Sequence, residues 1–237
     1  MTAIDKLLSI ALSEVGYLEK NNGSFLYDKT ANAGSANYTK YGYEMRSLYP
    51  STMDYPAPWC DSFVDWCFVQ AFGREVAEKL LHKFDDYTVN SAGYYKNNKE
   101  WHKSPEVGDQ IFFTDSKGGI CHTGIVYALD NTYVYTIEGN TSSASGVIAN
   151  GGCVAKKSYK RNYNRIAGYG RPNYAIVKEE KAMLETGNDI VWELMNGKYK
   201  VEINEVQRAV EAVDKAKDSS EFCSLYWILY KLVNENG

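Results

Sequence analysis

The sequence predicts an α+β fold in which helices come first and an antiparallel sheet follows. Before Pro105, apolar residues recur at three- and four-residue spacing, which is typical of helices. From Pro105 onward, short stretches alternate in polarity and are separated by turn residues, which is typical of strands. The sequence therefore predicts a first domain over 1–176, a charged linker over 177–187, and a small helical domain over 188–237.

Composition limits the class of protein. The 237 residues are 44% hydrophobic and 24% charged, as in ordinary globular proteins, and the net charge of −4 argues against nucleic-acid or anionic-membrane partners. No apolar run is long enough to cross a membrane. The N-terminal MTAIDKLLSIALSEVG contains Asp5 and Glu14 and lacks a basic start, so it reads as an amphipathic helix and not a signal peptide. Five cysteines without CxxC spacing argue against a disulfide framework or a zinc site, so we expect no metal or cofactor and synthesis in a reducing cytoplasm.

The helical part is predicted element by element. Residues 4–15 form an amphipathic helix, and 17–58, rich in Gly, Asn, Ser, Thr and Tyr, are predicted to be a long loop. A helix follows from about Cys60 to Gly73, a short one over 74–84, and helix plus loop over 85–104.

The chain is organised around the helix that begins near Cys60. Pro58 keeps the approach extended, and the apolar residues after Cys60 predict one buried helix face. A cysteine in the first helical turn lies where free N–H groups and the helix dipole favour the thiolate, the nucleophilic form. The alternative is that Cys60, beside Trp59, is a small core residue.

The second part of the first domain is predicted to be strands. Gly108 and Asp109 form a turn before the apolar IFF, and 122–129 alternates as a strand. The stretch NTYVYTIEGN follows a turn at Asp130–Asn131, and two further strands are predicted over 147–155 and 166–169.

The C-terminal segment is predicted to form three short helices, over 189–196, from Asn204, and from Asp218. The last helix is apolar almost all round and must be buried. The segment NDIVWELMNGKYK faintly resembles small wall-binding repeats of phage lysins. The alternatives are that these helices pack on the first domain or form a homo-oligomer.

A cysteine nucleophile needs a base, and the chain has three histidines. His82 lies among charged residues in AEKLLHKF, and His102 lies in the polar stretch KEWHKSP. His122 opens a strand, which is a rigid mount for a base. We therefore prefer His122 as the base over the alternative of a structural histidine at a sheet edge.

Glu138 and Asn140 are candidates for the group that orients the histidine and fixes its tautomer. They are two residues apart at a strand end, so both are expected on the same face of the sheet. If their strand pairs with the preceding one, Glu138 lies close to His122. The alternative is that both are turn residues beside Gly139.

The ordered segments APWCDSFVDWCF, PEVGDQIFF, CHTGIV, IEGN and IAGYGRP resemble the CHAP domain, a family of cysteine- and histidine-dependent amidohydrolases and peptidases. The resemblance covers roughly 4–176 and implies a papain-like, NlpC/P60-like α+β domain. It implies Cys60 as nucleophile, His122 as base, Glu138 as orienting acid and Asn140 as an auxiliary polar group. A glutamate at this third position favours CHAP over the sister NlpC/P60 family, which often has histidine there.

The resemblance also implies peptidoglycan as the substrate, cut at the amide between muramic acid and L-alanine or within the stem or cross-bridge peptide. The segment NYTKYG looks like phage lysins, which implies an endolysin that stays cytoplasmic until a holin opens the membrane. Some CHAP lysins bind calcium before the cysteine, but only Asp54 and Asp61 flank it here, so calcium is not expected. The alternatives are a wall-remodelling or toxin enzyme of the same fold, or a non-catalytic wall-binding protein.

Overall fold

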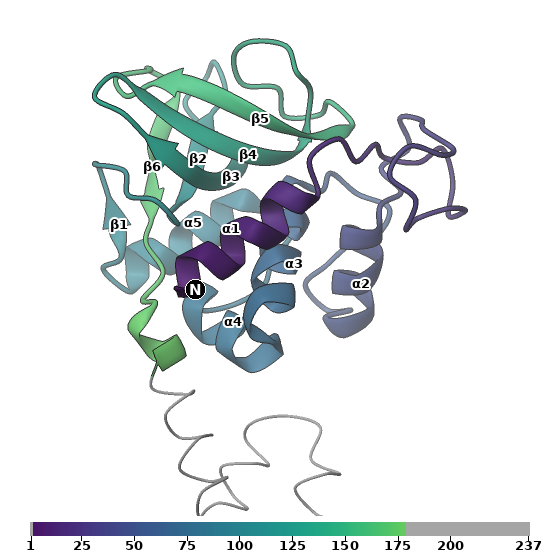
Figure 1. Cartoon of the computed structure of the whole chain (residues 1–237), viewed down its shortest axis with the longest axis horizontal. Helices are drawn as coiled ribbons and strands as arrows, with labels where there is room; N and C mark the ends of the chain where they lie inside the picture. Colours follow the sequence, from purple (N-terminus) through teal and green to yellow (C-terminus); the bar gives the residue numbers. More distant parts are fainter. Residues whose placement is uncertain (1, 179–237) are drawn as a thin grey trace, which may run out of the picture. The chain divides into compact units, whose positions relative to one another are not determined.

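The computed structural model describes residues 2–178, and its first compact unit ends at Tyr174. The predicted three-helix segment over 188–237 and most of the predicted linker over 177–187 lie outside the described residues. In the first unit, helices α1 to α5 lie on one side of a six-stranded antiparallel sheet (Figure 1). This is the mixed class of helices and antiparallel sheet that the sequence predicts.

The N-terminal helix α1 spans Ala3–Ser13 and begins with a reciprocal cap. The Asp5 N–H donates to Thr2 Oγ1 at 3.1 Å, and the Thr2 N–H donates to Asp5 Oδ2 at 2.8 Å. Leu7 and Ala11, one turn apart, are fully buried. The cap fixes where the helix starts, and the buried stripe fixes which side faces the core.

The prediction of a continuous loop over 17–58 is wrong, because helix α2 spans Lys40–Leu48 within it. The Thr39 hydroxyl accepts from the Gly42 N–H at 3.1 Å, which caps the first turn. Tyr41 and Met45, four residues apart, are fully buried. The glycine-rich and tyrosine-rich composition of this segment obscured a short helix that is held mainly by its cap and by packing.

The central helix α3 spans Cys60–Phe72 and ends at Gly73, as predicted. It packs against α1, α2 and strands of the sheet, so every residue from Cys60 to Phe68 is buried. The sequence predicted that only one face of this helix is buried, but its first nine residues are buried on all sides. Helices α4 (Arg74–Leu81) and α5 (Thr88–Asn97) follow where the sequence predicts helix.

The sheet has the strand order β1-β6-β2-β3-β4-β5. The strands are β1 (Trp101–His102), β2 (Gln110–Thr114), β3 (Ile120–Leu129), β4 (Tyr133–Thr141), β5 (Cys153–Lys160) and β6 (Ile166–Gly170). Strands β3 and β4 form a hairpin, in which the Asp130 carboxylate accepts from the backbone N–H groups of Thr132 and Tyr133 at 2.6 and 2.7 Å. The predicted turn at Asp130–Asn131 is confirmed, because this carboxylate supplies the acceptor that closes it.

The predicted strand over 147–155 is displaced, because β5 begins only at Cys153. Val147 is buried, but it belongs to the loop before β5 and packs with Ile111, Phe113 and Val126. Val147 is apolar because it packs in this core cluster, although it does not lie in a strand. The sheet is buried on its other face too, where Phe112 lies against Tyr95 of α5 with ring centroids 6.1 Å apart.

Candidate active site

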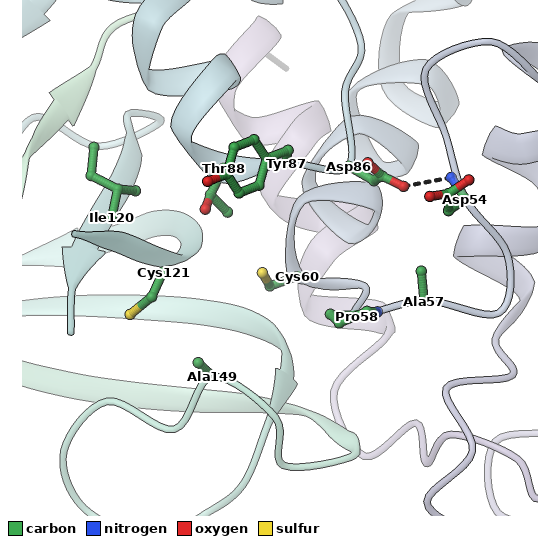
Figure 2. A pocket seen from close by; sticks show the side chains of 10 residues that line it. All are labelled: Asp54, Ala57, Pro58, Cys60, Asp86, Tyr87, Thr88, Ile120, Cys121 and Ala149. Atoms are coloured by element: carbon green, nitrogen blue, oxygen red, sulfur yellow. Dashed lines mark hydrogen bonds between the residues drawn. The ribbon is translucent and has the colours of Figure 1, made fainter.

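Cys60 is the first residue of α3 and lines a groove of about 410 Å³. Cys60 is only 5% exposed, and its side chain is one of those that line the groove (Figure 2). The preceding Trp59 is anchored by its indole N–H, which donates to Glu19 Oε2 at 2.8 Å. No side chain caps the start of α3, which leaves its first N–H groups and the positive end of the helix dipole available to a thiolate.

His122 lies on β3 and is completely buried. Its Nε2 is 2.9 Å from Glu138 Oε2, and its Nδ1 has no hydrogen-bond partner of ordinary geometry among residues 2–178. Burial favours the neutral ring, but hydrogen bonding to Cys60 and Glu138 and the charges of both outweigh it and raise the pKa of His122 to about 10. The site therefore favours a protonated His122 ring.

Glu138 lies on β4 with no exposed surface, and both of its oxygens have partners. Oε1 accepts from the Thr136 hydroxyl at 2.5 Å, and Oε2 accepts from the Tyr159 hydroxyl at 3.2 Å in addition to its contact with His122. On β3, a Cβ at Gly124 would lie 2.5 Å from Glu138 Cγ. Gly124 therefore makes room for the carboxylate.

Asn140 is buried but makes no hydrogen bond with His122 among those found in residues 2–178. Its Nδ2 donates to the carbonyl of Ala149 at 3.2 Å, and Ala149 lines the groove. Asn140 has a left-handed backbone with φ 53°, and the strand register shifts between Glu138 and Thr141. The regular alternation from which the sequence argument placed Asn140 beside Glu138 is therefore interrupted.

The other two histidines lie outside this arrangement. His82 follows α4, and its Nε2 is 2.7 Å from Glu100 Oε2. His102 lies on the edge strand β1. Neither lines the groove.

The groove changes character along its length. Asp54 and Asp86 lie at one end, Ile120 and Cys121 lie at the other, and Cys60 lies between them (Figure 2). The Asp54 N–H donates to Asp86 Oδ2 at 2.5 Å, which joins the two acidic residues. An amide held at Cys60 would therefore have a polar, acidic environment on one side and a more apolar one on the other.

Sequence reasoning missed a buried acidic pair on α3. Asp61 accepts from the Ser91 hydroxyl at 2.5 Å and from Gln110 Nε2 at 2.9 Å, and burial raises its pKa to about 7. Asp65, one turn further, accepts from the Asp85 N–H at 3.1 Å, and burial together with the charge of Asp61 raises its pKa well above the ordinary value. The sequence marked Asp61 only as a neighbour of the cysteine.

Residues 2–178 show neither a metal-binding cluster nor a membrane-spanning helix. No group of three or more His, Cys, Asp or Glu side chains in this part of the chain could hold a metal ion. No helix in the same part has the length and hydropathy needed to cross a bilayer.

Part of the chain matches a known protein family. Residues 50–140 match the model of the CHAP domain family, and this range contains Cys60, His122 and Glu138. No curated protein matches the sequence. A solved structure titled "The crystal structure of Ly7917" aligns with 15% identity and a TM-score of 0.33 over 73% of this chain, and the alignment spans 63% of that protein's chain.

Proposed function

We propose that the chain is a peptidoglycan hydrolase that cuts an amide bond of the bacterial cell wall with Cys60 as nucleophile and His122 as base. The observation that carries the proposal is the buried 2.9 Å contact between His122 and Glu138 beside Cys60 in an open groove. The CHAP domain at 50–140 supports a wall substrate, and the mixed fold is compatible with a papain-like architecture.

The proposed reaction begins with the Cys60 thiolate, which His122 keeps ionised by holding the proton. The sulfur attacks the amide carbonyl carbon, and the uncapped N–H groups at the start of α3 would stabilise the oxyanion. The C–N bond breaks as the imidazolium protonates the leaving amine, which leaves a thioester on Cys60. His122, now neutral, takes a proton from water, whose oxygen attacks the thioester and releases the carboxylic acid and the thiolate.

Glu138 is proposed to orient the imidazole through this sequence. Its contact with Nε2 holds that ring nitrogen protonated, which leaves Nδ1 to exchange the proton with the sulfur, the leaving amine and water. We do not assign Asn140 a chemical step. Its hydrogen bond to Ala149 supports a role in shaping the groove wall.

We further propose that the enzyme acts as a phage or prophage endolysin, either as an N-acetylmuramoyl-L-alanine amidase or as an endopeptidase. The sequence resemblance to phage lysins supports this role. Such an enzyme would be made in the cytoplasm and would meet peptidoglycan only after release.

The test uses purified Gram-positive walls, with turbidity as the rate measurement and mass spectrometry of the released fragments. We expect wild-type protein to clear the walls and Cys60→Ala to leave them intact. A new carboxyl on muramic acid with a free L-alanine amine would identify an amidase, whereas new termini within the peptide would identify an endopeptidase. Equal clearing by wild type and Cys60→Ala would refute the mechanism.

The C-terminal segment is proposed to bind the wall or to join two copies of the chain. Removing residues after about 180 separates these roles. A wall-binding segment raises the local concentration of catalyst, so truncation should slow lysis of intact cells more than cleavage of a soluble muropeptide. An oligomerising segment should instead lower the mass measured by light scattering and affect both substrates alike.

A further inference from the structure

Tyr159 reaches the catalytic carboxylate from the strand next to it. It lies on β5, and its hydroxyl donates to Glu138 Oε2 at 3.2 Å, the same oxygen that contacts His122 Nε2 at 2.9 Å. The other oxygen accepts from Thr136 at 2.5 Å. A buried carboxylate is stable as an anion only when hydrogen-bond donors surround it, and these three side chains supply them.

The Tyr159 hydroxyl acts as a donor. Burial and the charge of Glu138 both raise the pKa of Tyr159, so the phenol keeps its proton. The hydroxyl has a second acceptor, the Gly146 carbonyl at 3.4 Å, but it has only one proton. The carboxylate is nearer and charged, which makes it the stronger acceptor.

The Tyr159 ring is held in place on both sides. It packs against Phe113 with centroids 4.6 Å apart and stacks on Tyr163 with centroids 5.5 Å apart. The Tyr159 hydroxyl is therefore held in one position, from which it donates its hydrogen bond to the carboxylate. The terminal torsion of a glutamate has a broad energy minimum, so fixed partners at its oxygens determine its orientation.

We propose that Tyr159 is a positioning residue that sets the orientation of Glu138 and, through it, of the His122 imidazole. This inference rests on the proposed function for its effect on turnover. Its effect on the Cys60–His122 pair does not need any substrate. Thr136 secures the oxygen that does not face His122, so Tyr159 is the described residue that shares the reacting side of the carboxylate with the histidine.

The experiment measures two quantities in Tyr159→Phe, which removes one oxygen and keeps the ring. The first is the rate at which iodoacetamide alkylates Cys60 as a function of pH, resolved from the other cysteines by peptide mass spectrometry. The second is kcat and KM on a soluble muropeptide. Tyr163→Phe is the matched control, because Tyr163 stacks on Tyr159 but donates no hydrogen bond to Glu138 among those found in residues 2–178.

We expect the Cys60 alkylation profile of Tyr159→Phe to move to higher pH, because a less firmly held carboxylate stabilises the imidazolium, and hence the thiolate, less well. The kcat should fall about 10-fold, the loss expected for one hydrogen bond to a charged group, with KM little changed. Thr136→Val should move the alkylation profile in the same direction. In a Glu138→Ala background, Tyr159→Phe should add little, because the carboxylate that Tyr159 holds is then absent.

The outcomes separate this inference from the proposed function. An unchanged alkylation profile in Tyr159→Phe, or effects that simply add to those of Glu138→Ala, would overturn the positioning role and leave the hydrolase proposal standing. A Tyr159→Phe protein that fails to fold would also overturn it, because the hydroxyl would then be structural. If wild-type protein cleaves no peptidoglycan but the profile moves as expected, the proposed function fails and the positioning role stands.

Discussion

The buried carboxyl of Asp61 should make the folded protein less stable as the pH rises. Its pKa is raised from the ordinary 3.8 to about 7 because the side chain is buried. Between these values the unfolded chain has lost the proton while the folded protein retains it, so raising the pH favours unfolding. Stability from this group is present at low pH and is lost as the pH approaches 7.

The magnitude follows from the interval between the two pKa values. At about 1.36 kcal/mol for each pH unit, the interval corresponds to about 4 kcal/mol, a large share of the roughly 5–15 kcal/mol by which a domain is stable. Asp61→Asn removes the ionisation and can keep both contacts, because its carbonyl accepts from Gln110 and its amide donates to Ser91. The wild type should therefore lose about 4 kcal/mol from about pH 4 to about pH 8 that the variant does not lose.

Urea unfolding at a series of pH values measures this difference. His122, whose pKa is raised to about 10, also makes stability fall at alkaline pH, but it does so in both proteins and cancels in the comparison. Asp130→Asn is the control of opposite sign, because hydrogen bonds from the Tyr135 hydroxyl and from two backbone N–H groups lower the pKa of Asp130. Parallel stability curves for wild type and Asp61→Asn would refute the conclusion that burial keeps Asp61 protonated.

Five further substitutions test the site by wall lysis, with circular dichroism as the check on folding. Cys60→Ala should abolish lysis, whereas Cys67→Ala should keep most of it, because Cys67 is fully buried and burial raises its pKa well above the ordinary value. His122→Ala should abolish lysis. Glu138→Gln should lose less of the lysis rate, because the amide oxygen can still accept from the imidazole ring. An orienting role of this kind is worth up to about 10⁴ in rate. Gly124→Ala should lower the rate without removing any polar group, because its methyl would lie only 2.5 Å from Glu138 Cγ. A normal rate would show that the carboxylate can shift freely.

The start and end of α3 and the contact between His122 and Glu138 could be predicted from the sequence, because they depend on turn-forming and helix-ending residues nearby in the chain. The start of α3 at Cys60 follows from the preceding prolines, and its end follows from Gly73. The contact between His122 and Glu138 follows from a hairpin whose turn at Asp130 is readable in the sequence. Each of these depends on residues close together in the chain or on one pairing of neighbouring strands.

The buried acidic pair could not be predicted, because the groups that accommodate it are distant in sequence. Asp61 is held by Ser91 and Gln110, and Asp65 is held by the backbone of Asp85. Helical periodicity treats two aspartates four residues apart as a solvent-facing stripe. The two aspartates are buried because α5 and β2, which are distant in sequence, pack around α3.

The residues around Glu138 determine how its carboxylate is held, and the identity of Glu138 alone does not. The sequence predicts that a carboxylate lies near His122, but three features outside the set determine how it is held. Gly124 leaves the space, Thr136 secures one oxygen, and Tyr159 shares the other with the histidine. Asn140, two residues away and of suitable chemistry, lacks such surroundings because the register shifts before it, and it bonds to the groove wall instead. A glycine and a tyrosine that face the carboxylate from neighbouring strands are therefore part of what holds it against His122.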